Sequence, residues 1–168
     1  MQGRLAEMAD RVAQPGRLAW IGLRPARLAE MVQVEEAEIG AAGIAGDHGR
    51  AGPRAVTLVQ AEHLAAVGSY LGRGPVEAAL LRRNLVVAGL NLSALKGRRV
   101  RIGSAVLEIT GVCAPCSRME AALGPGGYAA LRGHGGWCAA VVAPGRVAVG
   151  EAVVPLPPDA SGAAAETR

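Results

Sequence analysis

The chain has 168 residues, of which 51% are hydrophobic and 19% charged, so enough apolar surface is available for a core and a wholly disordered protein is excluded. Its 18 Lys and Arg against 14 Asp and Glu give a formal net charge of +4, less than a dedicated DNA-binding arm carries. With no Phe, two Trp and two Tyr, the chain also lacks the stacking surfaces that single-stranded nucleic acids need. Residues 81–107 hold several Arg and Lys and no carboxylate, which favours an anion as partner. We expect one domain that does not bind nucleic acid.

The sequence shows no pattern typical of secretion or membrane insertion. No run approaches the ~18 apolar residues that a membrane-spanning helix needs, and the N-terminal segment carries Glu7 and Asp10 in place of an apolar signal-peptide core. Cys113, Cys116 and Cys138 are an odd number of cysteines and do not suggest a disulfide framework. We expect a cytoplasmic protein with reduced thiols and no membrane partner.

Residues 1–16 predict an N-terminal helical arm, because Leu5, Met8 and Val12 recur at helical spacing before Pro15 ends the helix. Residues 17–154 are expected to form the main domain. Its first half contains, in chain order, a predicted strand at 18–23, a strand at 31–39, a glycine-rich loop at 40–53, a strand at 54–59 and a helix at 60–71.

The second half of the domain is predicted to mix short strands with short helices. In chain order we expect a helix from 75 through 81, a strand at 85–87, a single turn at 91–96, a hairpin of strands 100–102 and 105–110, a helix at 117–123, and a final hairpin of strands 137–142 and 146–154. At the start of the helix at 117–123, Ser117 and Glu120 match a capping box. Residues 155–168 are rich in Pro and Ala and predict a disordered tail.

These elements amount to about seven or eight short strands and a few short flanking helices, without sustained βαβ alternation. Such a pattern favours a mostly β fold with a closed or nearly closed, barrel-like architecture. The 24 glycines, about twice the typical ~7%, agree with this fold because barrels use glycine at bulges, corners and hairpins.

The segment Cys113-Ala114-Pro115-Cys116-Ser117-Arg118 places two thiols between a strand and a helix, beside a guanidinium. In such a position a thiolate is stabilised and can act as a nucleophile or as a ligand for a soft metal. Three interpretations are open. Cys113 and Cys116 could form a redox pair, although the βαβ context of thioredoxin-type sites is missing; both could join His134 and Cys138 in a zinc site; or a single thiolate could bind a softer metal. Spacing alone ranks the zinc site first.

Three further polar clusters are candidate parts of an anion site. The loop GIAGDH at 43–48 holds the carboxylate of Asp47 and the imidazole of His48. The tripeptide RRN at 82–84 precedes an apolar strand, and its arginines can bind phosphate or carboxylate through paired hydrogen bonds. The segment RGHGG at 132–136 combines Arg and His with glycines that permit close approach of the backbone to a ligand.

Taken together and in order, seven segments resemble the MOSC domain family, named from the C-terminal part of molybdenum cofactor sulfurase. Together they span roughly residues 40–154, and they are GIAGDH (43–48), RAVTL followed by EHL (54–58 and 62–64), LRRNLVVAG (81–89), IGSAVLE (102–108), CAPCSRM (113–119), GHGG (133–136) and PGRVAVG (144–150). The chain departs from the family pattern at Ala114, where close relatives often carry His, and at Glu151, where Asp is common.

The resemblance implies a barrel-like fold and a small, stand-alone, bacterial-type MOSC protein. Such a protein binds the molybdenum cofactor (molybdopterin) or carries sulfur on one cysteine for the assembly of metal-sulfur centres. Cys116 matches that cysteine and would ligate molybdenum or carry a persulfide. The other expected catalytic residues are Cys113, His134, Asp47 and His48, and the expected cofactor-binding residues are Arg54, Thr57, Arg82, Arg83, Asn84 and Arg118.

Two activities follow from the resemblance. A molybdenum-dependent oxidoreductase would reduce N-hydroxylated compounds with an electron-transfer partner, and a sulfur transferase would receive sulfur from a donor such as a cysteine desulfurase. The alternatives are a metal-free persulfide carrier, a Cys/His zinc-binding module and an anion-binding module without catalysis. The zinc site ranks lower after the resemblance, because Cys138 stands where the family usually has an aliphatic residue. Pyridoxal phosphate is not expected in this chain, since sulfurases bind it in a separate domain.

Several glycines fall inside the matched loops, beside the candidate site residues. We expect part of the glycine excess to allow the backbone to approach a ligand closely. These positions are Gly43, Gly46, Gly111, Gly133, Gly135 and Gly136.

Overall fold

The computed structural model describes residues 2–158. Its strands are β1 (Gly16–Leu23), β2 (Val32–Val34), β3 (Glu36–Gly40), β4 (Gly43–Ile44), β5 (Val56–Gln60), β6 (Leu85–Ala88), β7 (Arg99–Ile102), β8 (Ala105–Val112), β9 (Trp137–Ala143), β10 (Gly145–Ala148) and β11 (Ala152–Pro155). Its helices are α1 (Gln2–Ala9), α2 (Ala61–Tyr70), α3 (Ala78–Leu81), α4 (Ser117–Leu123) and α5 (Gly127–Leu131), with a 3-10 turn, η1, at Leu92–Leu95.

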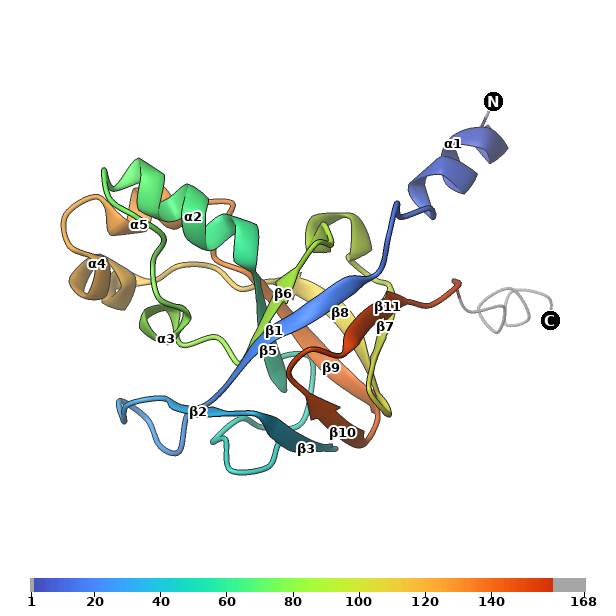
Figure 1. Cartoon of the computed structure of the whole chain (residues 1–168), viewed down its shortest axis with the longest axis horizontal. Helices are drawn as coiled ribbons and strands as arrows, with labels where there is room; N and C mark the ends of the chain where they lie inside the picture. Colours follow the sequence, from blue (N-terminus) through green and yellow to red (C-terminus); the bar gives the residue numbers. More distant parts are fainter. Residues whose placement is uncertain (1, 159–168) are drawn as a thin grey trace.

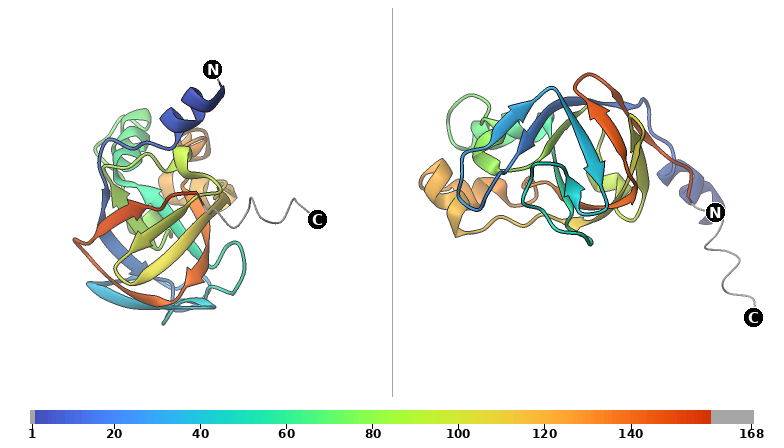
Figure 2. Two further views of the ribbon diagram at one scale, coloured as in Figure 1. Left: turned by 90° about the vertical axis from the view of Figure 1, so that its right-hand side faces the viewer. Right: turned by 90° about the horizontal axis from the view of Figure 1, so that it is seen from below.

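The strands form a closed barrel, as the sequence predicted (Figure 1). Seven strands make up the barrel in the order β11-β7-β8-β9-β5-β6-β1, and the pairing of β11 with β1 closes it. Strand β2 pairs with β1 outside this ring. A separate three-stranded sheet has the order β10-β3-β4. In Figure 1 and in the right-hand view of Figure 2 the helices α2 to α5 gather at one end of the barrel, and α1 projects near the other end. Among the described residues, the helices are too short or too polar to cross a membrane.

Strands β5 and β6 pair in parallel, and the chain passes between them through α2 and α3. A parallel pair needs a crossover connection, so the barrel contains a βαβ unit, although the rest of the described fold is built from antiparallel pairs. Asn84 directly precedes β6 and therefore lies where this crossover returns to the barrel. The βαβ unit thus places Asn84 beside Thr57 of β5, which is also a candidate site residue.

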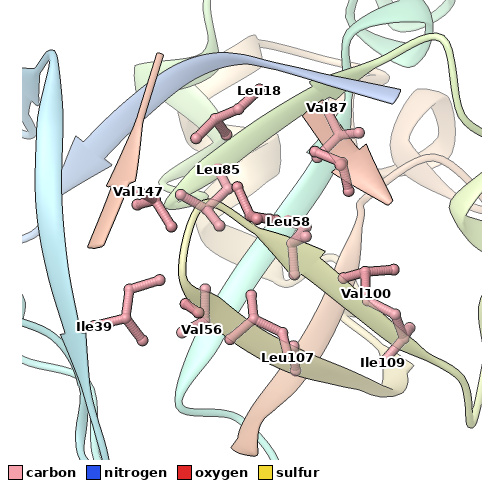
Figure 3. Close-up of a cluster of buried hydrophobic side chains, with 14 of the residues drawn as sticks. Leu18, Ile39, Val56, Leu58, Leu85, Val87, Val100, Leu107, Ile109 and Val147 are labelled. Carbon is pink, nitrogen blue, oxygen red and sulfur yellow. The ribbon is translucent and has the colours of Figure 1, made fainter. Parts of the chain in front are cut away.

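All five residues of β5 are buried because the strand has a core on each of its two faces. Val56 and Leu58 point into the barrel, where they meet Leu85 and Val87 of β6 (Figure 3). The next residue, Val59, faces the opposite side and packs under the helices. It belongs to a second cluster, whose other buried members are Val67, Val76, Leu81, Val86, Met119, Leu123, Ala130 and Leu131. Alternate residues of a strand face opposite sides, which explains why β5 and β6 read as continuous apolar runs.

Two strand predictions were wrong. Residues 31–39 are not one strand, because β2 pairs with β1 whereas β3 pairs with β4 and β10. The expected final hairpin is also absent: β9 pairs with β8 and β5, and the stretch 146–154 divides into β10, which joins the small sheet, and β11, which closes the barrel. Hydrophobic alternation indicates that a segment is extended but leaves its partner strand open.

The capping box predicted for α4 was wrong as well. Cys116 occupies the N-cap position, and no side chain caps the first turn. The carboxylate of Glu120 instead accepts hydrogen bonds from the backbone nitrogens of Gly126 (2.9 Å) and Tyr128 (2.8 Å). Glu120 therefore joins α4 to α5, a five-residue helix whose brevity left no periodic signal in the sequence.

Two glycines of the matched loops, Gly43 and Gly136, approach the protein's own backbone closely. A Cβ atom at Gly43 would lie 2.5 Å from the carbonyl oxygen of Ala55, and one at Gly136 would lie 2.2 Å from that of Leu58. Both residues have positive φ, 111° and 97°, a region that L side chains rarely adopt. These two glycines let neighbouring chain segments pack together.

The last strand ends close to the expected boundary of the main domain. Pro155 still belongs to β11, where it pairs with Val100 of β7. Residues 159–168 of the tail predicted at 155–168 lie outside the described part of the chain.

Candidate functional site

Asp47 lies at the centre of a buried polar network that joins distant parts of the chain. Its Oδ1 accepts hydrogen bonds from the backbone nitrogen of Arg24 (2.7 Å), from Nε of Arg24 (3.1 Å) and from Nδ2 of Asn84 (3.0 Å). Its Oδ2 accepts hydrogen bonds from Nη2 of Arg24 (2.9 Å) and from the backbone nitrogen of Gly49 (2.9 Å). The side chain of Asp47 is 0% exposed and that of Arg24 is 16% exposed. A buried carboxylate is stable only with such complete pairing.

This environment lowers the pKa of Asp47. Burial by itself would raise that pKa, but the hydrogen bonds and charge of Arg24, helped by the amide of Gly49, outweigh it. Asp47 is therefore ionised at neutral pH. Because both of its oxygens are occupied by partners, its role is to fix the guanidinium of Arg24 in position.

Asn84 and Thr57 complete the network from the barrel side. Nδ2 of Asn84 donates to the carbonyl oxygen of Gly22 (3.1 Å), and its Oδ1 accepts from the backbone nitrogen and the hydroxyl of Thr57 (3.1 Å each). The backbone nitrogen of Asn84 donates in turn to Oγ1 of Thr57 (3.0 Å). Both side chains are buried, so in the structure they brace β5, β6 and Arg24, and the direct cofactor contact that we expected stays a prediction.

Arg83 also faces inward. It is 8% exposed and donates to the carbonyl oxygens of Gly135 (2.7 Å), Leu81 (2.9 Å) and Cys113 (3.4 Å). Its guanidinium therefore ties the cysteine loop and the glycine loop to the end of α3. The expected contact of Arg83 with a cofactor phosphate stays a prediction.

A cavity with a volume of about 530 Å³ opens beside the Asp47 network, and almost every side chain that lines it is basic. We call it the basic pocket, and its lining residues are Arg24, Arg27, His48, Gly49, Arg50 and Arg54. The sequence singled out His48 and Arg54 but missed Arg24, Arg27 and Arg50. Arg24 and Arg27 lie in the irregular connection between β1 and β2, where no local pattern distinguishes them from surface arginines.

Arg82 connects the basic pocket electrostatically with the cysteine loop. Its backbone is left-handed, with φ of 55°, and its guanidinium donates to the carbonyl oxygens of Ala29 and Ala26. The pKa of Arg82 is lowered by burial and by the positive charges of Arg24 and Arg118, against the opposing effect of Asp47. Arg24, Arg82 and Arg118 thus lie in one region that has too few carboxylates to neutralise them. Their combined positive charge attracts an anion.

The three cysteines have different environments. Cys116 is exposed, whereas Cys113 and Cys138 are buried at 7% and 3% exposure. The pairing of β8 with β9 makes Cys113 a diagonal neighbour of Cys138, since Gly111 pairs with Cys138 and the backbone nitrogen of Cys113 donates to the carbonyl oxygen of Gly136 (2.9 Å). The two thiols of the possible redox pair therefore differ in exposure, with Cys113 buried and Cys116 facing solvent.

His134 packs on helix α2. Its ring lies 4.5 Å from that of His63 and 5.6 Å from that of Tyr70, measured between centroids. Among residues 2–158, no three His, Cys, Asp or Glu side chains are grouped so that they could hold a metal ion. The structure thus does not assemble the zinc site of Cys113, Cys116, His134 and Cys138, and it groups His134 with α2 instead of with Asp47 and His48.

The histidine pair is sensitive to charge. Burial and the neighbouring His134 lower the pKa of His63, while Glu62 partly opposes this change. Both effects disfavour the imidazolium form of His63. Its contact with His134 therefore favours the neutral form of His63.

Comparison with known proteins supports the family resemblance and the fold. The model of the MOSC domain matches residues 45–154. No curated protein sequence matches significantly.

Three solved structures have a similar fold. The YuaD protein from Bacillus subtilis is 17% identical, with a TM-score of 0.72 over 84% of this chain and 96% of its own. YiiM from Geobacillus stearothermophilus is 19% identical, with a TM-score of 0.69 over 85% of this chain and 76% of its own. YiiM from Escherichia coli is 22% identical, with a TM-score of 0.66 over 85% of this chain and 71% of its own.

Proposed function

Because this chain belongs to the MOSC domain family, we propose that it binds a molybdopterin-type cofactor, with the cofactor phosphate in the basic pocket and the thiol of Cys116 as the protein ligand of molybdenum. The observation that carries the proposal is the convergence of Arg24, Arg27, Arg50 and Arg54 on one cavity. Four guanidinium groups around one opening match the charge and the hydrogen-bonding geometry of a phosphate.

The residues present fit such a cofactor in size and in chemistry. The volume of the basic pocket, about 530 Å³, is typical of sites for small molecules. A soft thiolate suits molybdenum, and the exposed thiol of Cys116 is accessible to a ligand. Arg118 follows Cys116 by two residues and lies within the field of Arg82, so positive charge extends from the pocket to the cysteine.

Each part of the site has a distinct role in the proposal. Arg24, Arg54 and Arg82 bind and orient the anionic end of the cofactor, and His48 at the pocket lining accepts or donates a proton. Asp47 holds Arg24, and the remaining buried residues of the network, Thr57, Arg83 and Asn84, keep the surrounding strands and loops in place. When bound, molybdenum would supply redox chemistry, and we propose the reduction of N-hydroxylated compounds, with an electron-transfer partner, as the reaction.

The test is expression in a host that makes the cofactor, followed by metal analysis and by fluorescence of the oxidised pterin. The wild-type protein should contain molybdenum and pterin, and Cys116→Ser should lose most of the molybdenum. Arg101→Gln, which removes an exposed charge from β7, should behave like the wild type. Stoichiometric zinc without pterin, or equal molybdenum in wild type and Cys116→Ser, would contradict the proposal.

A second candidate function rests on the accessibility of the cysteines. Since Cys116 is exposed while Cys113 and Cys138 are buried, a sulfur donor such as a cysteine desulfurase can reach Cys116 in preference to the other two. The protein would then carry a persulfide on Cys116. Incubation with a desulfurase and cysteine should add the mass of a sulfur atom, reversibly by reductant, and peptide mapping should place it on Cys116. A persulfide on Cys113, or none at all, would contradict this function.

A further inference from the structure

The outer face of the barrel next to the helices is only partly covered. Trp20 of β1 pairs with Val86 of β6, and Gly22 of β1 pairs with Gln33 of β2. Because Trp20 and Gly22 are two residues apart, they lie on the same face of β1, whereas Ile21 between them belongs to the core of the barrel. A cavity with a volume of about 500 Å³ lies on this outer face, and we call it the apolar cavity.

Small side chains on the covering helix leave the apolar cavity open. Helix α3 has only four residues and lines the cavity with Ala78 and Ala79, while α2 contributes Leu64. Larger side chains at positions 78 and 79 would fill the space between α3 and the strands. A volume of this size, lined mainly by apolar side chains, is typical of sites for small molecules.

Trp20 gives the apolar cavity an aromatic surface. Its indole lies along β1 over Gly22, where a Cβ atom would stand 2.1 Å from Cη2 of Trp20 and 2.8 Å from Cε of Met31. Only glycine at position 22 leaves room for the ring and for the neighbouring methyl group. Because Trp20 is partly exposed and lines the cavity, an aromatic ligand can stack on it, and an indole is also the side chain on which a cation binds best.

The charge at the apolar cavity is negative. Among the described residues that line it, Glu77 alone is charged. Glu77 is exposed at the start of α3 and does not cap this helix, and within residues 2–158 its carboxylate has no hydrogen-bond or ion-pair partner. The amide oxygen of Gln33, which also lines the cavity, adds a neutral acceptor. A carboxylate and an amide oxygen beside an indole favour a cationic nitrogen as ligand.

A second cavity extends the apolar cavity toward the connection between β1 and β2. Its volume is about 440 Å³, and it shares Met31 and Ala79 with the first. Leu28 and Leu80 line it and are 71% and 39% exposed. Its charged lining residues are one acid and one base, so it adds no net charge. Large apolar side chains that remain exposed together mark a binding surface, and the extension provides room for an apolar substituent on the ligand.

We propose that the apolar cavity binds a small aromatic molecule that carries a protonated amine, with the ring on Trp20 and the amine at Glu77. Within the described chain, the residues that line this cavity and those that line the basic pocket are different. The two sites also attract opposite charges, since the basic pocket favours an anion. The ligand is therefore a second molecule besides the cofactor proposed above, and its binding does not depend on Cys116.

The experiment titrates benzylamine into the isotope-labelled full chain and follows the indole N–H signals of Trp20 and Trp137 by nuclear magnetic resonance. Trp20→Phe assigns the two signals. Benzylamine should shift the Trp20 signal in a saturable manner and leave that of Trp137 unchanged. Benzyl alcohol has the same ring without the charge and should bind about tenfold more weakly. Benzoate, a planar anion of similar size, should leave the Trp20 signal unchanged.

Three variants test the roles of the residues. Glu77→Gln should weaken the binding of benzylamine about tenfold and leave that of benzyl alcohol unchanged. Glu35→Gln removes the same charge from an exposed residue outside the cavity and should bind both probes as the wild type does. Ala79→Leu fills the space without removing a proposed contact and should abolish binding. Circular dichroism confirms that each variant is folded.

Several results would overturn the proposal. They are equal affinities for benzylamine and benzyl alcohol, a Glu77→Gln variant that binds benzylamine as tightly as its parent, and shifts that do not saturate. The remaining one is a dimer in analytical ultracentrifugation whose Trp20 signal changes with protein concentration, because a second copy of the chain would then cover the cavity.

Discussion

Nδ2 of Asn84 donates a 3.0 Å hydrogen bond to Oδ1 of Asp47, and this contact joins the start of β6 to the glycine loop 37 residues earlier in the chain. The same carboxylate holds Arg24 by two side-chain hydrogen bonds. The position of the guanidinium that enters the basic pocket is therefore set by a buried amide that has no access to that pocket. Stability and ligand binding should be coupled at this point.

Substitution of Asn84 tests the network. Asn84→Ala leaves buried hydrogen-bonding groups of Asp47, Thr57 and Gly22 without this partner, and each such loss costs about 1–3 kcal/mol. We expect a decrease of roughly 3 kcal/mol or more in the free energy of unfolding, measured by urea denaturation. The matched control is Asn91→Ala, which removes only the exposed N-cap of η1 and should cost about 1 kcal/mol. Equal decreases in the free energy of unfolding for Asn84→Ala and Asn91→Ala would show that the buried network adds nothing to stability.

The basic pocket should bind inorganic phosphate through its exposed arginines. Arg27 and Arg50 line the pocket and are exposed, so the double substitution Arg27→Gln/Arg50→Gln should leave the fold intact. We expect it to weaken phosphate binding at low salt about tenfold, since a charged donor recognises an anion more strongly than a neutral amide does. The control Arg17→Gln/Arg101→Gln has the same net charge and should bind as the wild type does. Isothermal titration calorimetry distinguishes a local site from a general effect of net charge.

The contact of His63 with His134 should make stability depend on pH. The pKa of His63 is lowered in the folded protein from its ordinary value of 6.5 by burial and by His134, so the unfolded chain binds the proton more tightly. The contribution of His63 is therefore complete above pH 6.5 and is lost as the pH falls through the lower pKa of the folded state.

His63→Gln should remove this part of the pH dependence. Its melting temperature should decrease less between pH 7 and pH 5 than that of the wild type. His48→Gln alters an exposed histidine and should keep the wild-type slope. If the melting temperatures of His63→Gln and wild type changed equally with pH, the lowered pKa of His63 would be contradicted. Nuclear magnetic resonance titration of the imidazole protons provides a direct check.

The close backbone approach at Gly136 predicts a large effect of a single methyl group. Gly136→Ala would place a Cβ 2.2 Å from the carbonyl oxygen of Leu58 at a φ of 97°, and we expect a loss of roughly 2–4 kcal/mol in the free energy of unfolding. Gly111→Ala is the matched control, because a Cβ there meets nothing within 4 Å, and it should change stability by less than about 1 kcal/mol. A neutral Gly136→Ala would mean that the loop relaxes without cost.

Much of the fold could be predicted from local pattern. Short apolar segments indicated β1, β7 and β8, and the helical stripe indicated α2, because each of these depends on which residues of one segment must be buried. The segments 31–39 and 146–154 were assigned wrongly, since their division depends on β10 pairing with β3, far away in the sequence. Pairing between distant segments leaves little trace in the pattern of either segment.

The candidate site, too, could be predicted only where its residues stand in a distinctive local sequence. Asp47, His48 and Arg54 stood out as polar residues in or beside glycine-rich segments, and they do lie at or beside one pocket. Arg24 and Arg27 have no such local context, because arginine is common on any surface. Their role depends on a charge density that arises only when the segment after β1 folds over the loop at 43–48.

The sequence by itself determined the class of this protein. Its short apolar strands, its glycine-rich turns and the order of its motifs led to a mostly β barrel of the MOSC domain family, since these are properties of consecutive residues. The tertiary structure alone decided which cysteines become neighbours across strands. Spacing in the sequence placed Cys113 beside Cys116, but the register of β8 on β9 also makes Cys113 a diagonal neighbour of Cys138, because strand pairing sets neighbours independently of their distance along the chain.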